Sequence, residues 1–478
     1  MKSIPLAARL LGAVCAGLLS GALVLPAADA AARQSRSGRH AEAAAPLHVG
    51  RSLPNRAGRA APAGEVDMRA AVERALRDNP SLGKEESQKE ASEAARKSAM
   101  GAFGPKLGTT YSAAKQDRSV SPASGSKPAE KGTYTWAVEI SQPVFQGFNL
   151  LANYQKAALQ AESDKASLRK AELAMTETVQ TEYLNYLRYV DNYRSQKESL
   201  ERLRDQLRIT TAYHEVGLRP QLDVLQAEVD VRKAESLLIQ ASSNRDTSLA
   251  RLNTLLGLPA TEKVRYVGRL SKVPFDRSLE QCIASAYRRR PDLYIAALSV
   301  DIASKSQMQV QSGYYPQIEA YYNISQSGNT LDLQREGEYG SRTVVHEAGV
   351  KASWNVFQWG TTYYADKEAG WLVTKMRYAQ EDLKLTVGYE VKSKLLSVRE
   401  SAKRIAVAEK SVEQAREAWR VALARYQEQV GTNFDALDAS AKLTSAENDL
   451  TGARADYLTA LASLYVAMGE YHPDILRP

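Results

Sequence analysis

The chain has 478 residues, of which 25% are charged and 44% are hydrophobic, and its formal net charge is +8. This composition is typical of a folded protein, and no interior stretch approaches the roughly 20 apolar residues that a membrane-spanning helix needs. The basic residues either gather in one N-terminal segment or alternate with Asp and Glu, so the positive charge does not indicate a nucleic-acid-binding protein.

The N-terminal segment over 1–30 has the organisation of a secretory signal peptide. Positive charges precede a mostly apolar stretch over 10–25, and positions 28–30 form a small-x-small cleavage site. We therefore expect residues 1–30 to be removed on export; an uncleaved membrane anchor is the alternative. Cys15 lies inside the apolar stretch instead of ending it, so we expect no lipid on the mature N-terminus.

Residues 31–65 are rich in Ala, Arg, Gly, Pro and Ser and show no apolar period. This predicts a disordered basic N-terminal extension, which either contacts anionic lipid or peptidoglycan or serves as a linker. The mature chain would keep Cys282 as its single cysteine. A lone cysteine excludes an internal disulfide and a cysteine-rich metal site.

From Val66 onward the sequence repeats itself with a nearly constant offset. Several independent matches at one offset indicate a duplicated unit. The matching segments are 68–82 with 279–293, 144–147 with 356–360, and 252–257 with 464–469. The predicted domains are a first structural repeat over 66–270, a second over 271–470, and a C-terminal tail over 471–478.

Each repeat predicts two shorter helices, two strands, a very long helix and a long helix. The long helices span about 148–214, 220–257, 361–428 and 433–468. A helix as long as the first of them extends roughly 100 Å and must pack beside other helices. Its apolar residues step by four and three, which is a coiled-coil seam, and small residues on its other faces permit close packing on two sides. This arrangement favours the wall of a tube.

The four predicted strands span about 106–117, 133–145, 316–326 and 344–357, with loops at 117–131 and 329–342 expected on the surface. Apolar and polar residues alternate along them, and each has the length of a tilted transmembrane strand. Strands that cross lipid must close into a barrel. Four strands cannot close alone, so we expect subunits to share one barrel; a soluble, half-buried sheet is the alternative.

Short motifs follow one another in a fixed order along residues 66–470. They are Ala75-x-x-x-Asn79-Pro80, Gln142 to Gly147, Tyr213-x-x-Val216-Gly217-Leu218 with Asp223-Val224-Leu225, Leu255 to Pro259, Val356 to Gly360, and Tyr426 with Gly431-Thr432 and Asp435 to Asp438. Together with the duplication, they resemble the TolC family of outer-membrane efflux and secretion proteins.

The resemblance implies a protein that is mainly α with a transmembrane β-barrel. Three chains would form a homotrimer, in which long coiled-coil helices build a helical tunnel and four strands per subunit build a shared 12-stranded barrel. The expected location is the cell outer membrane, with the helical part in the periplasm. The expected partners are a periplasmic adaptor, an inner-membrane ABC transporter or proton-driven pump, and outer-membrane lipid.

The two turns between the long helices are predicted at Gly217 with Pro220 and at Gly431. The resemblance implies that they form the periplasmic gate, which a bond between Asp223 and Tyr426 holds shut. The family's gate often has an arginine in the second turn, where this chain has Gly431; Arg219 in the first turn is a possible substitute.

The resemblance also places Asp435 and Asp438 at the constriction of the tunnel. Three subunits would present a ring of carboxylates there, which favours cations. The alternative is that both are helix-start charges stabilised by the helix dipole.

The sequence predicts a channel that is not an enzyme. The five histidines are scattered without metal-ligand spacing, and there is no phosphate-binding loop, so we expect no metal and no cofactor. The missing lipoprotein cysteine favours type I protein secretion. A multidrug efflux duct is the first alternative, and a soluble periplasmic coiled-coil scaffold or adaptor is the alternative from another class.

Overall fold

The computed structural model describes residues 65–116, 131–328, 330–333 and 342–476, which lie in one compact unit. The predicted signal peptide over 1–30 and all but the last residue of the predicted extension over 31–65 lie outside the described residues. Most of the two predicted surface loops, at 117–131 and 329–342, lies outside them too.

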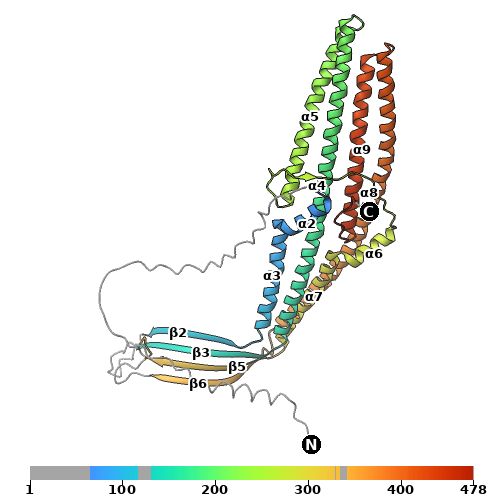
Figure 1. Cartoon of the computed structure of the whole chain (residues 1–478). Helices are drawn as coiled ribbons and strands as arrows, with labels where there is room; N and C mark the ends of the chain where they lie inside the picture. The colour runs from blue at the N-terminus through green and yellow to red at the C-terminus, as the bar shows by residue number, and fades with distance from the viewer. Residues whose placement is uncertain (1–64, 117–130, 329, 334–341, 477–478) are drawn as a thin grey trace, which may run out of the picture. The chain divides into compact units, whose positions relative to one another are not determined.

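The two repeats contain the same succession of elements (Figure 1). The first consists of α2 (Met68–Asp78), α3 (Pro80–Gly101), β2 (Lys106–Gln116), β3 (Lys131–Gln146), α4 (Asn149–Glu215) and α5 (Gln221–Leu255). The second consists of α6 (Leu279–Arg289), α7 (Pro291–Gln311), β5 (Gln317–Gly328), β6 (Thr343–Ser353), α8 (Thr361–Gln427) and α9 (Asn433–Ala467). The predicted long helices and four strands are confirmed.

The long helices of the two repeats correspond residue by residue. Helices α4 and α8 have 67 residues each, and α5 and α9 have 35 each. Helices α4 and α8 begin at Asn149 and Thr361, and α5 and α9 begin at Gln221 and Asn433, so the same offset relates both pairs. Any position in one hairpin of long helices can therefore be compared with its equivalent in the other.

The helices lie side by side, with α4 in the middle (Figure 1). Towards the strands, α4 packs between α3 and α7, and α7 also packs against α8. Towards the hairpin ends, α4 packs between α5 and α9, and α9 also packs against α8. Helix α8 therefore lies at one edge of this arrangement, and α3 and α5 lie at the other.

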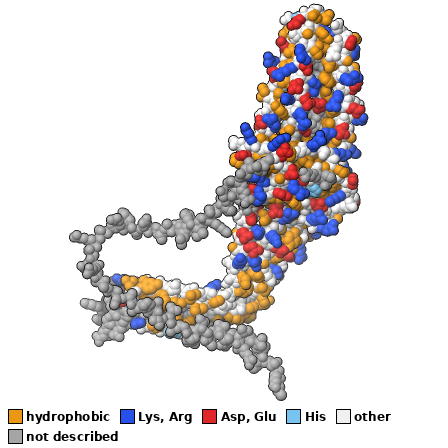
Figure 2. Space-filling model, viewed as in Figure 1, with side chains coloured by type: hydrophobic (Ala, Val, Ile, Leu, Met, Phe, Trp, Pro, Cys, Tyr) orange, Lys and Arg blue, Asp and Glu red, His pale blue; other side chains and the backbone are white. Residues whose placement is uncertain are grey.

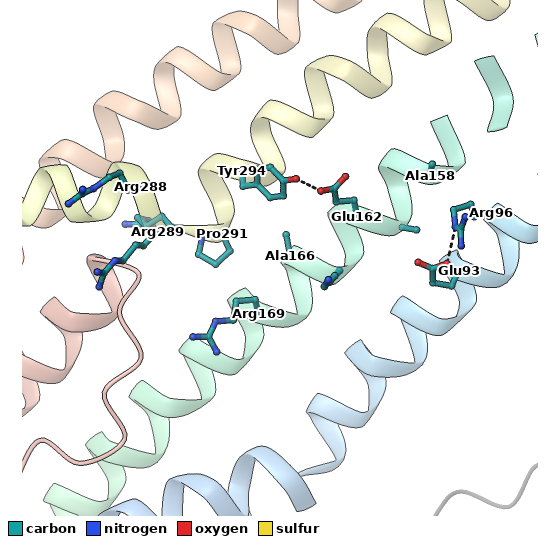
Figure 3. Close-up of a pocket in the computed structure, with 13 residues that line it drawn as sticks. Glu93, Arg96, Ala158, Glu162, Ala166, Arg169, Arg288, Arg289, Pro291 and Tyr294 are labelled. Atoms are coloured by element: carbon teal, nitrogen blue, oxygen red, sulfur yellow. Dashed lines mark hydrogen bonds and ion pairs between the residues drawn. The ribbon is translucent and has the colours of Figure 1, made fainter. Parts of the chain in front are cut away.

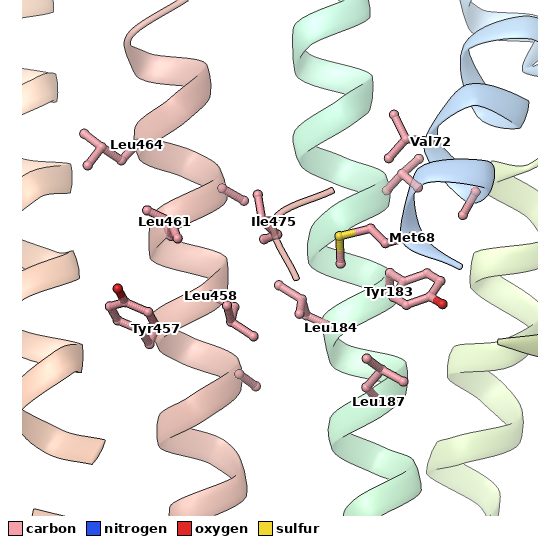
Figure 4. Packing of buried hydrophobic residues seen from close by; sticks show 14 of the residues in the cluster. Met68, Val72, Tyr183, Leu184, Leu187, Tyr457, Leu458, Leu461, Leu464 and Ile475 are labelled. Atoms are coloured by element: carbon pink, nitrogen blue, oxygen red, sulfur yellow. The ribbon is translucent and has the colours of Figure 1, made fainter. Parts of the chain in front are cut away.

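The main hydrophobic core lies at mid-length of the long helices, where α2, α6 and the C-terminal segment pack against them. In this cluster Tyr183 of α4 lies beside Met68 of α2, and Leu184 of α4 faces Leu458 of α9 (Figure 4). The Tyr183 hydroxyl lies 2.6 Å from the carbonyl oxygen of Val267, close to the two-residue parallel pair of β1 (Glu65–Val66) and β4 (Arg265–Tyr266). Burial raises the pKa of Tyr183.

The predicted C-terminal tail also takes part in this core. Ile475 is only 1% exposed and belongs to the same cluster as Tyr183. The segment after α9 therefore folds back onto the long helices.

The four longer strands form one antiparallel sheet in the order β2-β3-β5-β6. In one row of the register Leu107, Ile140, Tyr322 and Ala348 lie opposite one another, and in the next row Gly108, Glu139, Asn323 and Glu347 do so. Neighbouring rows point to opposite faces, so the alternation in the sequence gives one apolar and one polar face. In Figure 2 charged side chains crowd the helices but are sparse over the strands.

Strand β6 ends at Ser353, short of its predicted end at 357. Its neighbour β5 begins at Gln317, which pairs with Ser353. Residues 354–357 consequently find no partner strand among the described residues. Among the described helices, none combines the length and the apolar character needed to cross a membrane.

The turn from strand to long helix is built in the same way in both repeats. Gly147 and Phe148 have φ values of 58° and 69°, and Trp359 and Gly360 have values of 50° and 81°. Two consecutive left-handed residues, one of them glycine, produce each turn. At Gly147 a Cβ would lie 2.5 Å from the Ser312 carbonyl oxygen, so this position requires glycine.

Candidate gate at the hairpin tips

The tips of the two long-helix hairpins are tight turns. Gly217 lies in the first with a φ of 78°, and Pro220 is the N-cap of α5. The equivalent left-handed residue in the second turn is Gln429, with a φ of 62°, not Gly431. Gly431 lies close to the end of α8: a Cβ there would come within 3.2 Å of the Arg425 and Tyr426 backbone, so a side chain would require a small shift of the turn.

Buried hydrogen bonds join the two tips within one chain. The Gln206 amide on α4 donates to the side-chain oxygen of Asn433 on α9 at 2.8 Å. The Asn433 amide donates to the backbone oxygen of Asp223 at 3.0 Å. The Tyr426 hydroxyl on α8 donates to the Thr210 hydroxyl on α4 at 3.0 Å. Gln206, Thr210, Tyr426 and Asn433 are all buried, so we call them the tip cluster.

Arg219 of the first turn reaches across to the second. Its guanidinium donates to the Gly431 carbonyl oxygen at 2.9 Å and lies 5.0 Å from the centre of the Tyr426 ring. Arg219 and Gly431 occupy equivalent positions in the two turns, related by the same offset as the helix starts. The second turn has glycine at position 431, where an arginine was expected. The arginine of the first turn, Arg219, places a positive charge at this contact instead.

The expected bond between Tyr426 and Asp223 is not formed in this chain, since the Tyr426 hydroxyl donates to Thr210. Tyr426 is completely buried, and a neutral hydroxyl is a less costly partner at such a position than a carboxylate, which would have to lose its water. Burial raises the pKa of Tyr426; the bond to Thr210 and the Arg219 charge oppose this rise, and the Asp223 charge adds to it.

Asp435 and Asp438 lie in the first turns of α9. Asp435 is exposed and forms a capping box with Thr432: its carboxylate accepts from the Thr432 hydroxyl at 2.7 Å and from the Thr432 backbone N–H at 3.2 Å. These bonds lower the pKa of Asp435. Asp438 forms an ion pair of 2.7 Å with Lys442. In this chain, both carboxylates thus have local partners on or beside their own helix.

Sequence reasoning missed Gln206, Thr210 and Asn433. A signal was nevertheless present on α4, because Gln206, Thr210 and Tyr213 step by four and three, as residues of a coiled-coil seam do. This polar stripe runs beside the apolar seam of Leu200, Leu203 and Leu207, which packs against α5. A polar stripe with coiled-coil spacing predicts a second helix neighbour.

A separate hollow of about 710 Å³ lies between α3, α4 and α7, far along α4 from the tips (Figure 3). Small residues on α4, such as Ala158 and Ala166, leave this space. Two of its carboxylates already have partners: Glu93 pairs with Arg96 at 2.9 Å, and the Glu162 carboxylate accepts from the Tyr294 hydroxyl. Nowhere in the described ranges do three His, Cys, Asp or Glu residues come together to hold a metal.

Comparisons with known proteins agree with this architecture. A family profile described as "Outer membrane efflux protein" matches residues 71–258 and 282–470, one block in each repeat. The alkaline protease secretion protein AprF of Pseudomonas aeruginosa is 24% identical over 337 residues, which are 70% of this chain and 69% of AprF. The outer membrane protein TolC of Vibrio cholerae is 25% identical over 352 residues, 72% of this chain and 78% of TolC.

A solved structure shows the same fold. The outer membrane protein VceC of Vibrio cholerae matches with a TM-score of 0.69 and 17% identity, over 84% of this chain and 96% of VceC.

Proposed function

Because this chain belongs to the outer membrane efflux protein family, and is thus a non-enzymatic channel protein of the outer membrane, we propose that three copies form an exit duct across the periplasm and the outer membrane. The strands of the three copies close a shared barrel in the membrane, and the long helices form a tunnel whose far end is the hairpin tips. The tip cluster, with Arg219, keeps that end closed.

The observation that carries this proposal is an exposed coiled-coil seam on α8. Trp371, Tyr378, Leu385 and Tyr389 are spaced by seven, seven and four residues, and each is 72–75% exposed. Large apolar side chains with this spacing require a helix neighbour, and exposed apolar stripes mark interaction surfaces. Since α8 lies at an edge of the helices, a second copy is the natural neighbour.

The sheet supports the same assembly. Strands β2 and β6 are its two edges, and unpaired backbone groups at an edge are costly in lipid. Joining β6 of one copy to β2 of the next satisfies both edges and gives residues 354–357 a place to pair. Three copies then supply twelve strands, an even number within the range of bacterial outer-membrane barrels.

Aromatic residues at the helix end of the sheet support insertion in a membrane. Trp354, Phe357, Trp359 and Tyr364 are exposed around the second strand-to-helix turn, with Trp359 at 90%. Aromatic girdles flank the apolar band of outer-membrane barrels. We therefore assign this end of the sheet to the periplasmic membrane interface, which puts the helices in the periplasm. A soluble scaffold would have no use for this belt or for an exposed apolar sheet face.

For cargo we propose type I protein secretion, with an ABC transporter and a periplasmic adaptor as partners. Two observations support it: the similarity to a protein named for alkaline protease secretion and the absence of a lipoprotein cysteine after the predicted signal peptide. The second candidate is a multidrug efflux duct served by a proton-driven pump, which the efflux description of the family favours.

The test is single-channel conductance of the detergent-purified protein in a planar bilayer, with the mass of the detergent complex measured in parallel. A trimer with small, cation-selective currents is the expected result. A monomer that stays soluble without detergent and carries no current would refute the duct. Deleting the gene then separates the two cargo candidates: loss of a secreted protein supports secretion, and increased sensitivity to drugs supports efflux.

A further inference from the structure

The hollow between α3, α4 and α7 carries an excess of positive charge (Figure 3). Among the residues that line it, Lys and Arg outnumber Glu. The basic residues are Arg96, Lys165, Arg169, Arg288, Arg289 and Arg290, and the acidic ones are Glu93 and Glu162. Like charges that are held close together repel one another. The hollow is therefore stable only when carboxylates, from the chain or from a ligand, balance these cations.

The chain supplies carboxylates for most of the cations, at distances of 2.6–3.0 Å. The pairs are Arg96 with Glu93, Arg169 with Glu172, Arg289 with Glu470, and Arg290 with Asp292. Lys165 and Arg288 have no carboxylate within ion-pair distance in the described ranges. Arg288 donates from Nε to the Ala284 carbonyl oxygen at 3.2 Å, so its other N–H groups remain available. Two cations are thus free to bind an acidic ligand.

The equivalent junction in the first repeat does not have this excess. Arg77 is the equivalent of Arg288, and it pairs at 3.0 Å with the neighbouring residue, Asp78. In the second repeat the equivalent of Asp78 is Arg289, so Arg288 has lost that partner. Since the first repeat folds with a carboxylate at this position, the fold itself does not require three consecutive arginines before α7.

The long helices show the same contrast. Arg169 and Glu172 form an ion pair three residues apart on α4, and the equivalent pair on α8 is Glu381 with Lys384, with the charges exchanged. Either order stabilises a helix. On α4 the order chosen is the one that places the cation in the hollow, since Arg169 lines it and Glu172 does not.

The hollow opens on the side of the helices that the C-terminal segment covers. The Arg169 guanidinium lies 5.5 Å from the centre of the Tyr471 ring, and Arg289 pairs with Glu470. Both partners follow α9. In the duct that we propose this is the outer side, because the tunnel has to stay clear for cargo.

The hollow also lies away from the sheet. At a rise of 1.5 Å per residue, Ala158 and Arg169 lie about 14 and 30 Å along α4 from its start at Asn149. We have assigned the membrane interface to the strand-to-helix turns, so the lipid head groups do not reach this height. An acidic ligand of the hollow consequently comes from the periplasm.

From these observations we infer that the hollow binds a short peptide that carries two or more carboxylates, and that its source is the cell wall around the duct. The inference rests on the proposed function, which places this side of the helices in the periplasm, where the peptides of the wall present such groups. A hollow of about 710 Å³ has the size of a site for a small organic ligand. Arg288 offers a carboxylate two parallel hydrogen bonds, and Lys165 binds one as a point charge.

One group in the hollow opposes such a ligand. Glu162 is negatively charged, and the Tyr294 hydroxyl donates to it. This bond holds the Glu162 carboxylate against α7. A bound peptide would place its carboxylates towards Lys165 and Arg288, away from Glu162, which gives the site a preferred orientation for the ligand.

The test is binding of the free wall tripeptide, made of alanine, glutamate and diaminopimelate, to the detergent-purified protein by isothermal titration calorimetry. The same peptide with its carboxylates amidated is the ligand control. The site variant is Lys165→Gln with Arg288→Gln. The matched variant removes the same charge at the equivalent positions of the other repeat, Arg377→Gln with Arg77→Gln. Conductance and the thermal unfolding midpoint show whether each variant is intact.

We expect the tripeptide to bind, with an affinity that falls as the salt concentration rises. The site variant should bind at least about tenfold more weakly, because charge-assisted hydrogen bonds are lost, and the matched variant should bind as the original protein does. The inference is overturned if the amidated peptide binds equally well, if the original protein does not bind, or if both variants lose the same affinity. In the last case the net positive charge of the chain attracts the peptide, and not the hollow.

Two further measurements separate the source of the ligand and the fate of the duct. Co-sedimentation with purified wall sacculi should retain the original protein and release the site variant. Citrate that binds as tightly as the tripeptide, together with no retention on sacculi, would replace the wall by a free carboxylate and so contradict the inference. A conducting trimer that does not bind leaves the duct standing without this site. A protein that binds the tripeptide but neither conducts nor forms trimers refutes the duct alone.

Discussion

The core at mid-length and the cluster at the tips hold the same helices together by different means. Around Tyr183 and Leu461 the contact between α4 and α9 is apolar, continuous and closed by the C-terminal Ile475. At the tips the same two helices meet through Gln206, Thr210 and Asn433. Apolar burial gives most of the stability of a fold, whereas buried polar clusters depend on every partner being present.

This difference suggests a division of labour along the long helices. The mid-length core fixes how the two repeats pack, and it has no reason to change during transport. In the duct that we propose, the tip cluster closes one end with a few directional bonds, which a partner would weaken locally. Substitutions in the two regions should therefore have different consequences: loss of the folded protein in one, and loss of closure in the other.

The largest effect is expected from Tyr183→Ala in the mid-length core. Removing a fully buried aromatic side chain costs about 4 kcal/mol in unfolding free energy, and here it also removes the hydroxyl beside the Val267 carbonyl. Thermal unfolding in detergent, followed by circular dichroism, should show a marked drop in the midpoint. Tyr183→Phe, which keeps the ring, should lose much less. Equal losses in the two variants would mean that the hydroxyl, and not packing, supports this region.

Asn433→Ala should have a smaller effect on stability and a larger effect on closure. It leaves the Gln206 amide buried without its acceptor, which costs about 1–3 kcal/mol. Single-channel recordings should show larger or more frequent openings, with a modest fall in the unfolding midpoint. The matched control is Gln221→Ala at the equivalent exposed position. If the control opens the channel as much as Asn433→Ala does, the tip cluster does not close it.

Arg219→Ala should weaken closure less than Asn433→Ala. It removes one hydrogen bond to Gly431 and the contact with the Tyr426 ring. For a half-exposed group, these two interactions together contribute about 1 kcal/mol of free energy. Arg219→Lys keeps the charge and should keep part of the closure. Arg208→Ala, which removes an exposed pair with Asp205 on the same helix, should leave conductance unchanged. If Arg208→Ala opens the channel as strongly as Arg219→Ala does, the effect comes from the loss of positive charge in general and not from the Arg219 contact.

The long helices and the sheet could be predicted from the sequence because their signals are repetitive. Period-two alternation and coiled-coil spacing extend over many residues, and because of the duplication each pattern occurs in both repeats. The predicted end of β6 lies beyond the observed end. Apolar and polar residues continue to alternate through Val356, but pairing depends on where β5 begins. A strand boundary is set by the neighbour, which the sequence of one strand does not contain.

The tip contacts were harder to predict for a related reason. The residues of both turns were identified, but the partner of Tyr426 was not, since the choice between Thr210 and Asp223 depends on which helix faces it. Thr210 and Asn433 are common polar residues, and only their burial distinguishes them from surface positions. Arg219 is the informative exception: its equivalence to Gly431 is visible in the duplication itself.

The smallest effects are expected from Asp435→Asn and Asp438→Asn. Bonds to Thr432 lower the pKa of Asp435, so the capping box adds stability above the pKa of the unfolded chain, and this contribution is lost as the pH falls through the lowered pKa. Asp435→Asn should therefore flatten the acid side of the stability curve and change the midpoint little at neutral pH. Asp438→Asn leaves this capping box in place and is the matched variant.

Cation selectivity in a planar bilayer then decides what else these carboxylates do. If they line the tunnel, each substitution lowers the selectivity, and the double variant lowers it further, because three copies lose two charges each around a narrow aqueous path. If Asp435→Asn alters only the stability at acid pH and neither variant alters the selectivity, Asp435 is a helix cap. The prediction of a ring of carboxylates is then wrong. The closure at the tips would then depend on the tip cluster and Arg219 alone, without an electrostatic filter beside it.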